Sequence, residues 1–239
     1  FGTGANLNVS GGTVNFNNYA QTLRGLRFTG GAVNAPLSGV LTLVPSVSGD
    51  VVLELSGTSL TGNLGINAAT ASWGAVIKTN PSATTAMIGG RLDLQATNVT
   101  QSRSFDVAAG TVATVDPASG LAIDLDVTAS LINTAGTSAS VTKIGTGVMR
   151  LSGDILSNNT WSGTMTVNQG SLILAKTGIV NSAGGGGVAL IGNVTIGNGG
   201  AIYYGANEQI ANAASVTING GGSLDLRGFS DTFGALQVG

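Results

Sequence analysis

The chain of 239 residues contains neither cysteine nor histidine. Without cysteine it can form no disulfide framework and no thiolate metal site. Without histidine it lacks Ser-His-Asp chemistry, histidine metal ligands and the usual general base near neutral pH. We therefore expect no cofactor, no resident metal and no enzymatic activity.

Charge is scarce as well. Charged residues make up 8% of the chain, against roughly 25% in an ordinary soluble domain. The net charge is −2, and the nine basic residues are scattered, so we expect no nucleic-acid partner. No apolar run reaches the roughly 18 residues of a membrane-spanning helix, so we expect no membrane contact by this segment. The absence of an initiator Met and of a signal peptide leads us to expect a mature or excised segment.

Glycine is abundant. The chain has 39 glycines but only 4 prolines, and 42% of its residues are hydrophobic with few aromatics. This composition argues against collagen and against charged disorder. It is typical of many short strands joined by tight corners. With no linker-like charge run and no helical period, we expect a single domain over residues 1–239.

A short apolar pattern recurs along the chain. Leu7 and Val9 alternate with polar residues before a Gly-Gly turn, and the stretch from Val216 to Leu226 repeats this pattern. The same phrase begins at Val194, 22 residues before Val216. A period of about 20–30 residues is typical of a β-solenoid, because one coil cannot bury its apolar face alone and must stack on its neighbours.

The middle of the chain, from about residue 44 to 142, is less regular. Strands are still predicted at 51–55, 90–94 and 121–127, separated by Gly, Asn, Ser and Thr. A β-sandwich is the alternative fold, since short strands and turns alone do not fix strand direction.

The clearest unit is the stretch KIGTGVMRLSGDILSNNTWSGTMTVNQGSLIL, residues 143–174. Strands are predicted at 148–151, 165–167 and 171–174, with glycines where the backbone must turn tightly. Alternation assigns the following residues to the inner face: Met149, Leu151, Val167, Leu172 and Leu174. It assigns three others to the outer face: Arg150, Thr166 and Asn168.

This stretch resembles the passenger-associated repeat of bacterial autotransporters, whose pattern is roughly K-x-G-x-G-x-L-x-L-S-G, N-x-Y-x-G, then T-x-V-x-x-G-x-L-x-L. The matching residues are Lys143, Gly145, Gly147, Met149, Leu151, Ser152, Gly153, Asn159, Trp161 (in place of Tyr), Gly163, Thr166, Val167, Asn168, Gly170, Leu172 and Leu174. Extra residues around 154–157 depart from it and suggest a longer loop. The match covers about one-eighth of the chain. The resemblance implies a right-handed parallel β-helix exported to a bacterial cell surface.

Asp124 and Asp126 are the strongest candidates for chemistry. They flank Leu125 on a predicted strand, so both carboxylates should lie on one face, about 7 Å apart. A polysaccharide-cleaving β-helix enzyme would use such a pair. The simpler interpretation, which we favour, is the solvated face of an amphipathic strand with Leu121, Ile123, Leu125 and Val127 inside.

Other residues were weighed as ligand sites. Asp93 with Asp106, and Asp225 with Asp231, could ligate calcium if rungs brought them together, but no calcium-repeat or EF-hand spacing is present. Trp73 and Trp161 could stack on sugars, although Trp161 is expected to pack over the apolar stack. The run 184–187 is expected to be a corner and not a phosphate loop.

These patterns predict an all-β parallel β-helix (β-solenoid) of roughly ten coils, about 50 Å long, and the family resemblance implies that it is right-handed. The expected function is structural: a rigid spacer and adhesive segment of an autotransporter-like adhesin or extracellular fibre, outside the cell or on its surface. The alternatives are a carbohydrate-active β-helix enzyme or a glycan-binding module. Recognition of host glycans or proteins is expected at corners such as 63–79 or 154–161. Residues 7–29 and 216–239 form the same coil type without a polar cap, so we expect contact with flanking coils or end-to-end stacking with other copies.

Overall fold

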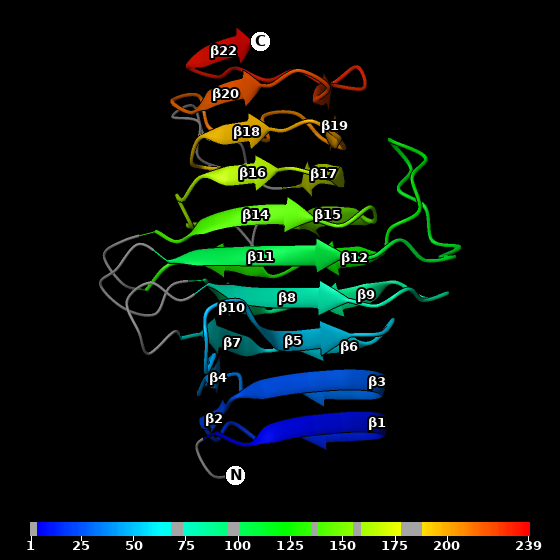
Figure 1. Cartoon of the computed structure of the whole chain (residues 1–239), viewed down its shortest axis with the longest axis vertical. Coiled ribbons are helices and arrows are strands. Elements are labelled where there is room, and N and C mark those ends of the chain that lie inside the picture. The colour runs from blue at the N-terminus through cyan, green and yellow to red at the C-terminus, as the bar shows by residue number, and fades with distance from the viewer. Residues whose placement is uncertain (1–3, 68–73, 95–100, 135–137, 155–158, 178–187) are drawn as a thin grey trace.

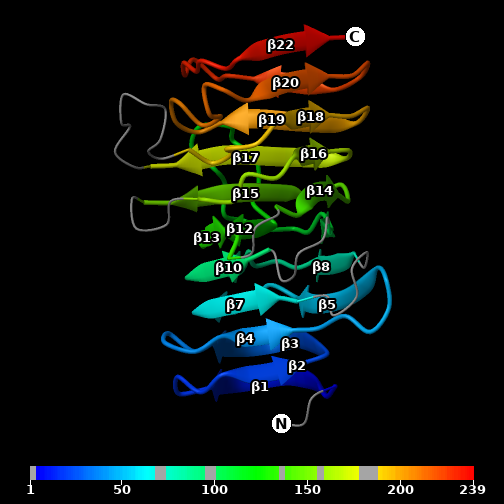
Figure 2. The same cartoon turned by 90° about the vertical axis from the view of Figure 1, so that its left-hand side faces the viewer.

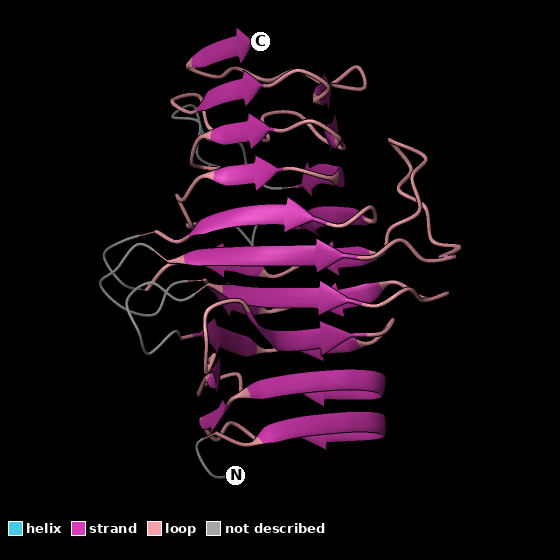
Figure 3. Cartoon of the chain, in the orientation of Figure 1, coloured by secondary structure: helices cyan, strands magenta, loops and turns pink. Residues whose placement is uncertain are grey.

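The computed structural model describes residues 4–67, 74–94, 101–134, 138–154, 159–177 and 188–239. Within these ranges the chain forms strands, turns and loops but no helix (Figure 3). Its strands lie in two sheets, one of 17 strands and one of five, and within each sheet all neighbouring strands pair in parallel. Parallel pairing excludes the antiparallel sandwich and confirms the parallel β-helix.

The first face of the helix is a column of ten stacked strands. From the N-terminal end these are β1 (Asn6–Asn15), β3 (Gly25–Asn34), β5 (Asp50–Leu55), β8 (Ala75–Thr79), β11 (Ser102–Val107), β14 (Ser140–Ile144), β16 (Met165–Val167), β18 (Val194–Ile196), β20 (Ser215–Ile218) and β22 (Ala235–Val238). We number the coils one to ten by these strands. In Figure 1 they run from left to right nearest the viewer while the chain rises from blue to red, so the coil is right-handed.

The second and third faces complete each coil. The second face continues β1 and β3 and then stacks β6 (Ser59–Thr61), β9 (Ala86–Ile88), β12 (Leu125–Val127), β15 (Val148–Gly153), β17 (Gly170–Lys176), β19 (Gly200–Tyr204) and β21 (Ser223–Asp225). The third face, seen in Figure 2, stacks β2 (Gln21–Leu23), β4 (Leu41–Leu43), β7 (Asn63–Ile66), β10 (Arg91–Asp93) and β13 (Ser130–Ile132).

Apolar residues line the inside of the coil in columns. Val141, Met165, Val194 and Val216 follow one another in register, and none exposes more than 1% of its surface. The predicted inner faces of β15, β16 and β17 are confirmed, because all five assigned residues are fully buried. The outer residues are half-buried or exposed. Stacked strands therefore share one core along the whole axis, as a solenoid requires.

Side-chain amides extend the third face beyond β13. The Leu131 N–H donates to Asn159 Oδ1 at 2.8 Å, and Asn159 Nδ2 donates to the Ala189 carbonyl at 2.7 Å. The Asn159 amide thus takes the place of a peptide group between two coils. Beside it, Trp161 is fully buried and its Nε1 donates to the Ala139 carbonyl, which confirms the expected packing of Trp161 on the core.

Residues 108–124 leave the coil as a strap, seen in green at the right of Figure 1. Its arms are held by an antiparallel bridge between Val115 and Ala122. Asp116 forms an ion pair with Arg150 of β15 at 3.4 Å, and Arg227 donates to the Ala118 carbonyl at 2.8 Å. Because β17 and β19 lie between β15 and β21, the strap crosses the outside of coils six to nine. Because residues up to 124 belong to the strap, the predicted strand at 121–127 is shorter than expected, and only 125–127 forms a strand.

Candidate functional site

Asp124 and Asp126 are buried, each with 8% of its surface exposed, so the expectation of a solvated face is wrong. Asp124 accepts the Gly110 and Val148 N–H groups at 2.7 and 2.8 Å, one on each oxygen. Asp126 accepts Arg150 Nη2 at 2.6 Å and the Ser152 hydroxyl at 2.6 Å. A strap residue thus holds Asp124, whereas Asp126 is held by two side chains of β15.

Arg150 lies between two buried acidic residues, Asp126 and Asp116. It pairs with Asp126 on its own sheet and with Asp116 on the strap, and hydrogen bonds to these carboxylates raise the pKa of Arg150. Asp116 in turn accepts the Ser119 N–H and hydroxyl inside the strap turn. The arrangement joins a coil to its covering loop, since each carboxylate has its partners within the protein.

Lys143, the first residue of the repeat motif, points into the coil and is fully buried. Its Nζ donates to three backbone carbonyls, those of Ile144, Gly145 and Gln169. Gly145 has φ = 76°, a conformation that favours glycine. Burial lowers the pKa of Lys143 to about 8, and burial likewise lowers the pKa of Lys176 to about 8. The lysine of the motif thus caps the corner of two coils.

Of the two acidic pairs considered as calcium ligands, the first is separated by the fold, and the members of the second have partners within the protein. Asp93 lies on the third face and Asp106 on the first. Asp225 forms an ion pair with Arg227 at 3.6 Å. Asp231 accepts the Tyr204 hydroxyl at 2.7 Å and the backbone N–H groups of three residues. Among the residues that the structure describes, no three acidic side chains gather as a metal site would need.

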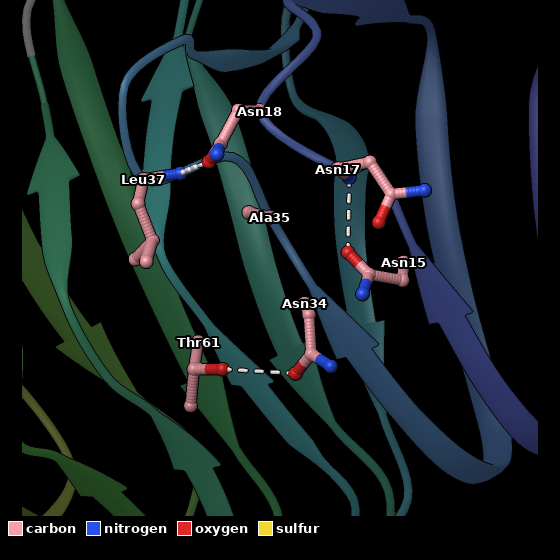
Figure 4. Close-up of a pocket in the computed structure, with 7 residues that line it drawn as sticks. All are labelled: Asn15, Asn17, Asn18, Asn34, Ala35, Leu37 and Thr61. Atoms are coloured by element: carbon pink, nitrogen blue, oxygen red, sulfur yellow. Dashed lines mark hydrogen bonds between the residues drawn. The ribbon is translucent and has the colours of Figure 1, made fainter.

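A shallow groove opens at the corner where the second face ends in coils one to three (Figure 4). Its volume is about 380 Å³, and it is lined by Asn15, Asn17, Asn18, Asn34, Ala35, Leu37 and Thr61, which we call the amide groove. Stacking creates it, because Asn15, Asn34 and Thr61 occupy one position in three successive coils. Asn17 and Asn18 form the adjoining turn with φ of 47° and 67°, which asparagine tolerates.

Hydrogen bonds fix how these amides face. Asn15 Oδ1 accepts the Asn17 N–H at 2.9 Å, and Asn18 Oδ1 accepts the Leu37 N–H at 3.0 Å. Asn34 Oδ1 accepts the Thr61 hydroxyl at 3.2 Å. The carbonyl side of each amide is thus engaged, while its NH₂ group makes no hydrogen bond with another described residue. Figure 4 shows the amide nitrogens of Asn15 and Asn34 facing the space between them.

The sequence did not reveal this groove. Recognition was expected at corners 63–79 and 154–161, of which residues 68–73 and 155–158 lie outside the described residues, as do Trp73 and the run 184–187. The available signal was the spacing of Asn15 and Asn34, which is 19 residues and equals one coil. Inferring from this spacing that the two asparagines stack would have required the length of the first coil, and the apolar pattern alone gave only a range of about 20–30 residues.

No family model, curated protein or solved structure matches the chain. The similarity to the autotransporter repeat therefore stays a prediction from the quoted residues. The described part of the chain also holds no helix long and apolar enough to cross a membrane.

Proposed function

We propose that this chain is a structural segment of a surface-exposed, autotransporter-like adhesin or extracellular fibre, in which it acts as a rigid spacer. The supporting observation is the uninterrupted stack of ten parallel coils around one apolar core. Stiffness follows because each strand between the ends hydrogen-bonds to the coils above and below it. The buried carboxylates of the strap region serve the fold, which weighs against the alternative of a polysaccharide-cleaving enzyme.

Antibodies against the folded chain should label intact cells of the organism that makes it, and protease added outside those cells should remove the label. Labelling only after lysis would refute surface exposure. Electron microscopy of the purified chain should show a rod. A compact or variable outline would refute the spacer role separately.

The proposed partners are flanking coils or further copies at the ends. Leu236 and Val238 of β22 continue the inward columns of β20 but are 54% and 69% exposed. Covering such a strand would pair its free edge and bury these side chains. Sedimentation at rising concentration should show association, and a variant with both residues changed to lysine should stay monomeric. Identical behaviour of the two proteins would refute end-to-end stacking.

A further inference from the structure

We propose that the amide groove binds a neutral oligosaccharide chain laid along the solenoid axis. A pocket in which a few polar groups converge is the default candidate for a ligand site. Here the polar groups are NH₂ donors from Asn15, Asn18 and Asn34, which belong to two chain segments, the end of β1 with its turn and the end of β3. This inference goes beyond the spacer role and does not depend on where the protein resides.

The donors are fixed by the protein. A backbone N–H can donate only to an acceptor, so the oxygens of Asn15 and Asn18 must face the Asn17 and Leu37 N–H groups. Each NH₂ is then directed away from its intramolecular partner. The opposite wall is also held, since Asn63 Nδ2 donates to the carbonyls of Leu37 and Gly39 at 2.6 and 3.1 Å. A ligand with hydrogen-bond acceptors would meet donors that are already positioned, which reduces the entropy lost on binding.

The charge of the lining selects the ligand class. None of the seven lining residues is charged, whereas sites for carboxylates or phosphates characteristically supply arginine or lysine. Apolar surface is present too, because Leu37 at the rim exposes 78% of its surface. Neutral amide donors beside an exposed aliphatic side chain match a sugar ring, which carries hydroxyl oxygens at its rim and C–H groups on its faces.

The layout selects a chain over a single sugar. Asn15, Asn34 and Thr61 belong to coils one, two and three, so the line of side chains spans two coil spacings, or roughly 10 Å. A ligand that contacts all three must extend across the coils. Tyr19, directly after Asn18, is 73% exposed and offers an aromatic surface next to this turn.

The test uses the purified chain, labelled with ¹⁵N, and titrates it with three neutral hexasaccharides: cellohexaose, mannohexaose and chitohexaose. Hexagalacturonate, an acidic hexasaccharide, is the comparator. At least one neutral sugar should bind saturably and shift the side-chain NH₂ signals of Asn15 and Asn34. Binding by none of the three, or tighter binding of hexagalacturonate, would overturn the proposal.

Variants separate binding from folding. Asn34→Ala should weaken binding at least about five-fold, the loss of one hydrogen bond, and Asn15→Ala together with it should abolish binding. Asn34→Asp keeps an acceptor for the Thr61 hydroxyl but removes the NH₂, so it should weaken neutral binding while the melting temperature stays near that of the parent. Asn168→Ala, an exposed asparagine of coil seven, should bind like the parent. Parental affinity in both Asn34 variants would overturn the site. Surface labelling of cells is a separate readout, so either proposal can fail alone.

Discussion

Replacing Asn159 by alanine removes the amide that joins two coils on the third face. The Leu131 N–H and the Ala189 carbonyl then lose these partners, and both groups belong to residues that are fully buried. Leaving a buried polar group unpaired costs about 1–3 kcal/mol, so two such groups predict a loss of about 2–6 kcal/mol. This is a large part of the roughly 5–15 kcal/mol that stabilises a typical protein.

Urea unfolding followed by far-ultraviolet circular dichroism would measure the loss as a lower midpoint at an unchanged slope. Hydrogen exchange provides a local readout, because the Leu131 amide should exchange faster in Asn159→Ala than in the parent. Asn168→Ala serves as the matched control, since Asn168 is exposed and its side chain makes no hydrogen bond with another described residue. The control should change stability by less than about 0.5 kcal/mol.

A second variant tests the direction of each bond. Asn159→Asp keeps the acceptor for the Leu131 N–H but, when ionised, cannot donate to the Ala189 carbonyl. It should be at least as unstable as the alanine variant near neutral pH. Relative to the parent at the same pH it should recover in acid, where the protonated carboxyl can donate. If Asn159→Ala and Asn168→Ala unfolded at the same urea concentration, the hydrogen bonds of the Asn159 amide would not stabilise the stack of coils, and the reasoning would be refuted.

Four further outcomes are expected. Val167→Asp should place an unpaired charge in the core and cost several kcal/mol, whereas Thr166→Asp, one residue away on the outer face, should be tolerated; equal melting temperatures would contradict the assigned faces. Between pH 8 and 10.5 the unfolded chain binds more protons at Lys143 than the folded chain does, so the free energy of unfolding should rise with pH by up to about 1.4 kcal/mol per pH unit for this group. Lys143→Met should reduce this slope in urea titrations at several pH values. An unchanged slope would count against a buried Lys143. Arg150→Ala should cost about 3–5 kcal/mol because it leaves buried carboxylates without their cation, and thermal melts within a degree of the parent would refute this. The chain should release no reducing ends from acidic polysaccharides; release that Asp124→Asn abolishes would show an enzyme.

The sequence predicted the fold where alternation was clean. Val194 lies beside Val216 in the sheet, as the 22-residue spacing indicated, and the motif strands bury the residues assigned to them. Both results follow from one local rule, that successive residues of a strand face opposite sides.

The remainder depended on contacts that no local pattern encodes. Asp124 and Asp126 looked solvated because alternation says nothing of a loop that folds over the outer face and brings Gly110 to Asp124. The sequence placed Lys143 in the repeat motif without indicating its role, which depends on backbone carbonyls from two coils around its ammonium group. The amide groove needed coil lengths, since only stacking places Asn34 above Asn15.

The strap also changes how the molecule can come apart. A solenoid with contacts only between neighbouring coils frays from its ends one coil at a time. Here Arg227, in coil nine, donates to Ala118, which lies 109 residues earlier on a loop rooted in coil five. Unfolding of coil nine therefore also releases the tip of the strap, so the stability of coils six to eight is coupled to that of coil nine. During folding this clasp can close only after the intervening coils have stacked, so its closure shows that the stack has reached coil nine. A force along the axis would be borne by the clasp together with the backbone hydrogen bonds between coils.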